Sequence, residues 1–287
     1  MEKRRIVQLF SALLNNAYIK GFATLSIYQG QGKAVCVPVL NCYSCPGALG
    51  SCPVGSAQFL LASYKHQVSL YIAGILTLAG ASSGRLVCGW LCPFGLLQEL
   101  LNKIPSPRWQ LAPVLKWLKY LVLILTLLLP ILWVNSAGLG SPYFCKYLCP
   151  AGTLEAGLPL GLGSGQLHPL LGALYYWKLA LLILLVAASI MIFRPFCRII
   201  CPLGAFYALF NSISLWRLEI NPARCVSCGI CTNICPMEIQ VTENPNHPEC
   251  IRCMRCTQNC PFEAIAYTRI NPAPIGLTGE IPEDLRT

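Results

Sequence analysis

Charged and imidazole side chains are scarce in this sequence of 287 residues. Only 11% of the residues are Asp, Glu, Lys or Arg, whereas an ordinary soluble domain carries about a quarter. The three His and four Met argue against histidine-containing zinc fingers and against a Met/His-rich copper site. Most of the chain therefore avoids water, and any metal chemistry depends on another residue type.

The sequence also lacks a convincing phosphate-binding loop and a base-reading motif. The glycines within 161–165 do not follow a strand and open a helix, as a nucleotide-binding turn requires. A net charge of +10 could suit nucleic acid, but the basic residues are placed asymmetrically around apolar runs. We therefore expect no nucleic-acid partner and interpret the excess charge as a signal of membrane topology.

Four apolar stretches are long enough to cross a hydrocarbon core, which needs about 20 residues each. They lie at roughly 6–28, 68–87, 115–134 and 171–193. With the N-terminus inside, the inner segments carry ten cations: Lys3, Arg4, Arg5, Arg85, Lys103, Arg108, Lys116, Lys119, Arg194 and Arg198. The outer loops, 30–66 and 136–170, carry Lys33, Lys65 and Lys146. This asymmetry predicts an α-helical integral membrane domain over residues 1–215, in the cytoplasmic (inner) membrane, with four spans and both termini cytoplasmic.

Eight of the eighteen cysteines form two copies of one spacing near the C-terminus. The copies are Cys225-x2-Cys228-x2-Cys231-x3-Cys235-Pro236 and Cys250-x2-Cys253-x2-Cys256-x3-Cys260-Pro261. Two-cluster bacterial ferredoxins use this run, with the fourth cysteine crossing to the other [4Fe–4S] cluster. One cluster would be bound by Cys225, Cys228, Cys231 and Cys260, and the other by Cys250, Cys253, Cys256 and Cys235. Structural zinc is the alternative.

The ferredoxin spacing predicts a small α+β domain over 216–270, followed by a polar tail over 271–287. Apolar segments at 217–220, 239–241 and 264–267 give it a βαβ-like rhythm. A reducing cytoplasm disfavours disulfides among these cysteines and favours metal ligation.

A second cysteine pattern, CxxxCPxG, recurs beside the apolar stretches. Its copies begin at Cys88, Cys145 and Cys197, and a degenerate relative contains Cys42, Cys45 and Cys52. The likeness continues to the sixth residue beyond the cysteine that precedes proline, which is Gln58, Gln98, Glu155 or Tyr207. Because the motifs alternate between the outer and inner sides, they predict two parallel halves related by an axis along the membrane normal.

Proline suits the first turn of a helix, so the preceding cysteine should cap that helix. At the positive end of the helix dipole, this cysteine is expected to have a lowered pKa. The repeat then predicts an inner set of Cys88, Cys92, Cys197 and Cys201. Outside, Cys145 and Cys149 would join two of Cys36, Cys42, Cys45 and Cys52. These sets are interpreted as additional iron–sulfur centres, with redox-active dithiols as the alternative.

These motifs resemble those of the NapH-type membrane ferredoxins, which are related to the membrane parts of NosR- and CcoG-like proteins. The resemblance covers about residues 68–268. The third Cys-x3-Cys-Pro, at Cys145, and the cysteine-rich loop 36–52 depart from that pattern, and the flavin-binding domain of the NosR type is absent. The resemblance implies electron transfer between the quinone pool and a partner redox protein, within a larger membrane complex similar to a quinol dehydrogenase.

Two functions remain open on the sequence. The first is a membrane electron-transfer subunit that connects cytoplasmic clusters with the quinone pool or a partner. The second is an assembly factor that reduces a metal ion, which the scarcity of Met and His disfavours. Glu99 and Glu155 follow the cysteine motifs; each is either a proton acceptor for quinol or an interfacial glutamate in water.

Overall fold

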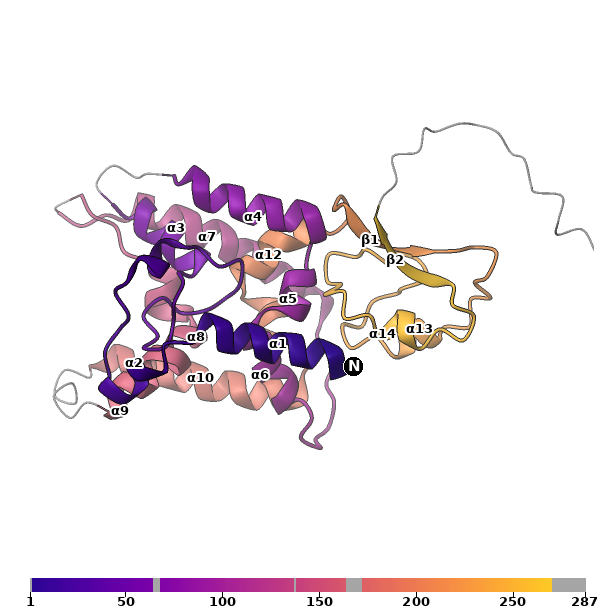
Figure 1. Ribbon diagram of the computed structural model, residues 1–287, viewed down its shortest axis with the longest axis horizontal. Helices are drawn as coiled ribbons and strands as arrows, with labels where there is room; N and C mark the ends of the chain where they lie inside the picture. The colour runs from indigo at the N-terminus through magenta and orange to yellow at the C-terminus, as the bar shows by residue number, and fades with distance from the viewer. Residues whose placement is uncertain (1, 64–67, 137, 164–171, 270–287) are drawn as a thin grey trace, which may run out of the picture.

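The computed structural model describes residues 2–63, 68–136, 138–163 and 172–269. A helical body extends along the long axis, and a small ferredoxin-like domain is attached at one end (Figure 1). The helices of the body are α1 (Glu2–Asn15), α2 (Ile19–Thr24), α3 (Pro53–Leu61), α4 (Leu70–Ser83), α5 (Leu86–Trp90), α6 (Pro93–Leu101), α7 (Leu118–Leu132), α8 (Pro150–Gly152), α9 (Leu158–Gly163), α10 (Ala173–Met191), α11 (Pro195–Ile199) and α12 (Pro202–Leu209). Short 3₁₀ or π segments are η1 (Gln31–Ala34), η2 (Pro113–Trp117), η3 (Phe144–Leu148) and η4 (Thr153–Gly157).

Two helical segments are long and apolar enough to cross a membrane, Pro113–Leu132 and Ala173–Met191. They coincide with the third and fourth predicted spans. The second predicted span is shorter than expected, because α4 has 14 residues. Only these three of the predicted spans are thus present as single apolar helices in the described part of the chain.

The prediction of one continuous span over 6–28 is wrong. Helix α1 ends at Asn15, and α2 starts at Ile19. Between them, the Tyr18 backbone N–H donates to the Gly47 carbonyl at 3.1 Å, and the Asn16 side chain donates to Asn41 Oδ1 at 2.8 Å. The chain therefore exchanges helical hydrogen bonds for bonds to the loop 41–47.

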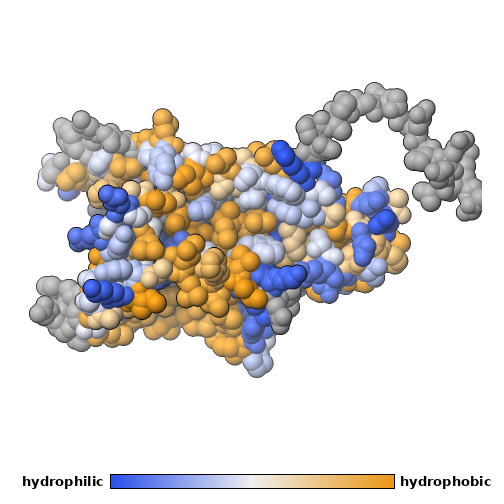
Figure 2. All heavy atoms as spheres, in the orientation of Figure 1, coloured by the Kyte–Doolittle hydropathy of each residue, from blue (hydrophilic) through white to orange (hydrophobic). Residues whose placement is uncertain are grey.

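The body has an apolar exterior. Only 22% of the most hydrophobic window of Pro113–Leu132 and 11% of that of Ala173–Met191 is buried inside the protein. Hydrophobic residues cover the middle of the body, whereas hydrophilic residues gather near its two ends (Figure 2). The buried core instead contains six cysteines of the repeated motifs: Cys52, Cys88, Cys92, Cys149, Cys197 and Cys201.

Four of the cysteines that precede proline in the body cap a helix, as the sequence predicts, whereas Cys45, which precedes Pro46, lies in a turn. Cys52, Cys92, Cys149 and Cys201 are the N-caps of α3, α6, α8 and α12, with the following proline in the first turn. The missing N–H of that proline costs no helical hydrogen bond. Four similar cysteine-capped turns are thereby built into the body.

The ferredoxin-like domain pairs β1 (Trp216–Ile220) with β2 (Ile265–Arg269) in an antiparallel ladder, Trp216 opposite Arg269. Helices α13 (Ile230–Asn233) and α14 (Arg255–Gln258) each contain the third cysteine of a run, Cys231 and Cys256. The predicted strand at 239–241 is absent: these residues form irregular backbone, although Ile239 and Val241 are buried. Their apolar character comes from packing in the core of the domain. The tail 271–287 lies outside the described residues.

Candidate iron–sulfur sites

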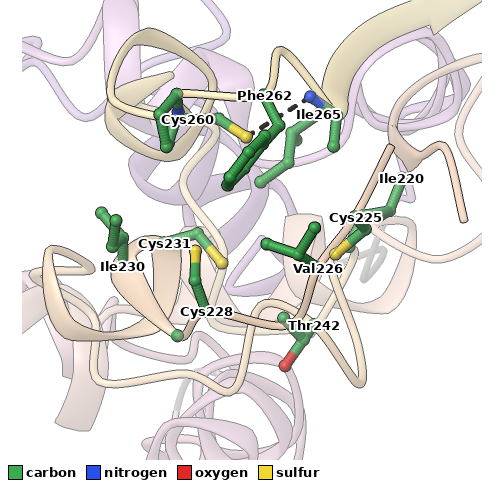
Figure 3. A pocket seen from close by; sticks show the side chains of 13 residues that line it. Ile220, Cys225, Val226, Cys228, Ile230, Cys231, Thr242, Cys260, Phe262 and Ile265 are labelled. Carbon is green, nitrogen blue, oxygen red and sulfur yellow. Dashed lines mark hydrogen bonds between the residues drawn. The ribbon is translucent and has the colours of Figure 1, made fainter. Parts of the chain in front are cut away.

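The eight ferredoxin cysteines line two separate cavities. Cys225, Cys228, Cys231 and Cys260 line the first, together with Val226 and Phe262 (Figure 3). Cys235, Cys250, Cys253 and Cys256 line the second. In each cavity, three thiols come from one run and the fourth from the other run. This grouping of side chains is the one that the crossed spacing predicts, while cluster ligation itself stays a prediction.

The backbone around the two cavities repeats at an interval of 25 residues, like the cysteines. Left-handed φ angles occur in pairs at Ser227 and Arg252, Gly229 and Met254, and Glu238 and Glu263. L-residues other than glycine rarely adopt this conformation. Such kinks let successive backbone N–H groups converge on one point, which is how anionic groups, including iron–sulfur clusters, are commonly held.

The inner set lies at the junction between the body and the ferredoxin-like domain. Cys88, Cys92, Cys197 and Cys201 are all buried, and Cys92 and Cys201 each lie close enough to the other members to interact electrostatically. Cys88 lies on α5 and Cys197 on α11, while Cys92 and Cys201 cap α6 and α12. The structure thus brings together the four cysteines that the repeat assigns to one side.

Two arginines at the inner set each contact a cysteine motif distant in the sequence from their own. Arg85 and Arg194 each precede the first cysteine of a motif by three residues. Arg85 donates to the carbonyl of Cys197 at 3.1 Å, and Arg194 donates to the carbonyl of Cys88 at 2.7 Å. Neither side chain is exposed. The arginine before Cys88 is therefore placed against the motif of Cys197, and the arginine before Cys197 against the motif of Cys88.

The outer set surrounds a cavity of about 230 Å³. The cysteines lining it are Cys42, Cys52, Cys145 and Cys149. The structure thus selects Cys42 and Cys52 from the four alternatives, whereas Cys36 and Cys45 are buried without lining this cavity. Lys178 also lines it and donates to the carbonyl of Cys145 at 3.1 Å.

Both sets are clamped by a glutamine of the first half, at the sixth position beyond the helix-capping cysteine. Gln98 donates to Cys197 Sγ at 3.2 Å and accepts from the Phe196 N–H at 3.1 Å. Gln58 donates to Cys145 Sγ at 3.4 Å and accepts from the Phe144 N–H at 2.9 Å. One amide therefore fixes both the sulfur and the backbone of the partner motif.

The second-half residues at the same position make different contacts. Glu155 accepts a hydrogen bond from the Cys42 backbone N–H at 2.6 Å, and Tyr207 donates to the carbonyl of Pro38 at 2.8 Å. The sequence shows the repeat at these four positions. It does not show their hydrogen-bond partners, because these lie 86 to 169 residues away.

The buried cations around the inner set outnumber their acidic partners. Arg4 and Arg194 pair with Glu99, Arg85 and Lys119 pair with Glu249, and Arg198 pairs with Glu238. The Nε atoms of Arg85, Arg194 and Arg198 are buried without a hydrogen-bond partner. A buried cation in excess needs an anion, so this environment fits a thiolate-ligated iron cluster.

These contacts revise two interpretations of the charged residues. Glu99 is not a glutamate in interfacial water, because it is 5% exposed and holds two arginines. Five of the ten cations assigned to membrane topology are also buried in these pairs. These five cations thus form buried ion pairs around the inner set and also contribute to the charge asymmetry.

Burial, rather than the helix dipole, dominates the acidity of the thiols. Desolvation raises the pKa of Cys92 to about 12, although the Gly95 backbone N–H acts in the opposite direction. Desolvation likewise raises the pKa of Cys250 to about 12. The expected lowering at the helix N-terminus is therefore wrong for Cys92. A reactive dithiol requires a lowered pKa, so a cationic metal centre fits the buried sites better.

No group of three or more His, Cys, Asp or Glu side chains within the described ranges is close enough to hold a single metal ion. A zinc site requires four sulfurs about 2.3 Å from one ion. In a [4Fe–4S] cluster each thiolate instead binds a different iron, so the thiols stand further apart around a cavity.

Residues beside the second ferredoxin cavity contact residues of the inner set directly. Ile251, beside Cys250, lies so close to α5 that a Cβ on Gly89 would be 2.0 Å from its carbonyl oxygen. Arg85 donates to Glu249 at 3.0 Å while it contacts the Cys197 carbonyl. Trp90 donates to the Arg252 carbonyl at 2.8 Å. One arginine thus contacts the neighbours of both sites.

Comparison with known proteins agrees with this arrangement. The family described as "4Fe-4S binding domain" matches residues 65–112, 120–158 and 175–221, and a second family of that description matches 218–240. An uncharacterised protein of Methanocaldococcus jannaschii is 34% identical over 206 residues, which are 67% of this chain and 75% of the relative. The chain belongs to the NapH-type ferredoxin family. No solved structure was found to match it.

Two further relatives of this NapH-type chain carry functional names. The ferredoxin-type protein NapH of Haemophilus influenzae is 27% identical over 68% of this chain and 63% of its own length. The putative electron transport protein YccM of Escherichia coli is 29% identical over 54% of this chain and 42% of its own length. The chain therefore spans less than two thirds of these two relatives. Electron transfer through [4Fe–4S]-binding domains is the role that the family and the cysteine sites share.

Proposed function

We propose that this protein conducts single electrons across the cytoplasmic membrane through four four-cysteine sites. The observation that carries the proposal is the division of sixteen cysteines into four groups, two in the ferredoxin-like domain and two in the body. Helices α5 and α12, which belong to the inner set, lie nearer the ferredoxin-like domain than α3 and α8, which belong to the outer set (Figure 1). Iron–sulfur clusters at these sites would supply one-electron carriers. A hydrocarbon core of about 30 Å needs such intermediate sites.

The chain's own residues give each site a defined task. The cysteines would hold the clusters, Gln58 and Gln98 orient the thiols of the partner motif, and Arg85 and Arg194 balance negative charge at the inner set. The packed body excludes water around the inner set. Together these groups support an electron carrier and give no reason to expect bond-making chemistry at the sulfur sites.

The orientation has support from the arrangement of the ends. Helix α1 begins at the end of the body that carries the ferredoxin-like domain (Figure 1). Together with the positive-inside asymmetry, this supports a cytoplasmic position for both. At an exposed edge of the first ferredoxin cavity, Cys228 is exposed and Val226 and Phe262 are 59% and 47% exposed. We propose that a partner redox subunit exchanges electrons at this edge.

An apolar cavity of about 340 Å³ supports quinone as a further reactant. It lies among α3, α4, α7 and α12 and touches Pro53 and Pro202, each adjacent to a helix-capping cysteine. Thr126 and Ser69 are its polar residues. A redox-active molecule with an apolar body would fit this cavity and could exchange electrons with either membrane site.

Vesicles with trapped ferricyanide test the proposal. An impermeant reductant outside should reduce the trapped oxidant when the purified protein is present, and a variant lacking Cys145 and Cys149 should not support this. Iron analysis should give about sixteen irons per chain, from four clusters of four. About eight irons would contradict the membrane sites, and full iron without transfer would contradict the conduit.

A quinone arm of the same experiment separates the two parts of the proposal. A membrane-soluble quinone should accelerate transfer, and Leu203→Trp, which fills the apolar cavity, should abolish that acceleration while leaving the iron content unchanged. If quinone has no effect on the parent protein, the quinone assignment is wrong and the conduit stands.

A further inference from the structure

The segment 36–42 is buried or half-buried in the body, although the sequence places it in an outer loop. Val39 and Leu40 are 2% exposed and Asn41 is fully buried. Val39 and Leu40 belong to the same buried cluster as Cys88 of the inner set and Cys149 of the outer set. Leu40 also lines the outer cavity, so the segment reaches the outer set.

Tyr207 reaches this segment from the inner set. It is fully buried on α12, six residues beyond Cys201, and its ring is close enough to Cys88 and Cys201 for electrostatic interaction. Its hydroxyl donates to the Pro38 carbonyl at 2.8 Å. Gln58 and Gln98, at the corresponding positions, bind the cysteine motif of their own set. Tyr207 instead binds the backbone of the segment that reaches the other set.

From Pro38 the connection continues to the outer set through one more hydrogen bond. The neighbouring Val37 N–H donates to the Ser51 carbonyl at 3.1 Å, and Ser51 is bonded to Cys52, which lines the outer cavity. Two hydrogen bonds thus join three covalent stretches into one route from Cys201 to Cys52. Electronic coupling falls steeply with every gap, and donor–acceptor contacts near 3 Å are shorter than the 3.5–4.0 Å of apolar packing.

We propose that Tyr207 is the coupling residue through which electrons pass between the inner and outer sites. The inference rests on the proposed function. One electron leaves the reduced site and reduces the oxidised one, and no proton moves. The Tyr207 ring is neither oxidised nor deprotonated, because it only bridges the two sites and its hydroxyl keeps the proton that it shares with Pro38.

The test compares two tyrosines that each donate to a backbone carbonyl. Tyr207→Phe removes the bond to Pro38, and Tyr143→Phe removes an equivalent 3.0 Å bond to Trp133 outside the route. After flash reduction of one membrane site, equilibration between the two sites should slow several-fold in Tyr207→Phe and stay unchanged in Tyr143→Phe. Iron content, EPR spectra and both reduction potentials should match those of the parent protein.

A second variant addresses the other hydrogen bond. Val37→Pro removes the N–H that binds Ser51 and should slow the same step without altering the tyrosine. Parent-like rates in both variants, with both sites filled, would overturn the coupling role and leave the conduit intact. A parent protein without membrane iron would overturn the proposed function first. A slowed rate accompanied by a shifted potential would assign Tyr207 to tuning rather than coupling, and would also overturn the inference.

Discussion

The inner and outer cysteine sets share a frame but differ in charge. In both, helix-capping cysteines face each other and a first-half glutamine binds the partner motif. The inner set lies against the guanidinium groups of Arg85 and Arg194, whereas the outer set has Lys178 and the buried carboxyl group of Glu155 beside it. The repeat thus conserves geometry while the surroundings set the electrostatics, and surrounding charge tunes the potential of a metal site.

The motif glycines show how this difference is built. A Cβ on Gly95 would lie 2.9 Å from Arg194 Nη1, so the glycine makes room for the arginine over the inner set. At the outer set, a Cβ on Gly152 would lie 3.6 Å from Cys42 Sγ and 3.9 Å from Lys178 Nζ. A Cβ would therefore clash with the arginine at Gly95 but would make only ordinary contacts at Gly152, so the close approach of a cation requires glycine at the inner set alone.

Removing a thiol should have the largest effect and should separate the two sites. We expect Cys201→Ser to remove the inner centre and Cys149→Ser the outer one, each with about a quarter of the iron, since each site would hold one of four clusters. Cys45→Ser is the matched control, because Cys45 is buried but does not line the outer cavity. Iron analysis with EPR measures the loss, and equal loss in the control would break the assignment of the outer set.

Removing a glutamine clamp should have an intermediate and similar effect at both sites. Gln98→Leu and Gln58→Leu each delete one bond to sulfur and one to a backbone N–H. Hydrogen bonds to charged groups contribute roughly 1.5–3 kcal/mol each, so each centre should be lost faster during chelator challenge, and its potential should fall. A response at only one site would show that the glutamines are not equivalent.

Neutralising a cation should have the smallest effect and should depend on the site. Arg194→Gln should lower the inner potential by on the order of 50–100 mV, the Coulomb contribution of one partly screened charge. Lys178→Gln should change the outer potential less, since Lys178 is only partly buried and solvent screens its charge more than that of the fully buried Arg194. Redox titration followed by EPR compares them; a larger shift for Lys178→Gln would reverse the electrostatic contrast.

Local patterns made much of this architecture predictable. The proline after Cys92 indicates a helix cap, and the spacing from Cys225 to Cys260 predicts two cavities with crossed cysteines. Both features could be predicted because they depend on residues close together in the sequence. The same local view failed for 6–28, where Asn16 and Tyr18 bond to a loop that the sequence places elsewhere. It also missed the roles of Arg85 and Arg194, since their partners lie more than 100 residues away.

Residue type led to a wrong or incomplete prediction where the same property has two possible structural causes. Ile239 and Val241 are apolar because they are buried beside the second cavity, and not because they form a strand. Arg198 contributes to the positive-inside count, yet it is buried in an ion pair with Glu238. Such double roles can be separated only when the partner residue is located.

The paired left-handed residues of the ferredoxin-like domain bear on how the protein matures. Five of them, including Arg252 and Met254, are not glycine, and each such residue costs about 1 kcal/mol or more in the free backbone. The domain has only two five-residue strands and two four-residue helices to offset this. Its folding should therefore be coupled to metal loading, as in other small metal-binding domains. During biogenesis, a nascent chain without iron would leave the helical body without its ferredoxin-like domain folded against it, with Arg85 and Lys119 deprived of Glu249. Such a chain would be a substrate for quality-control proteases.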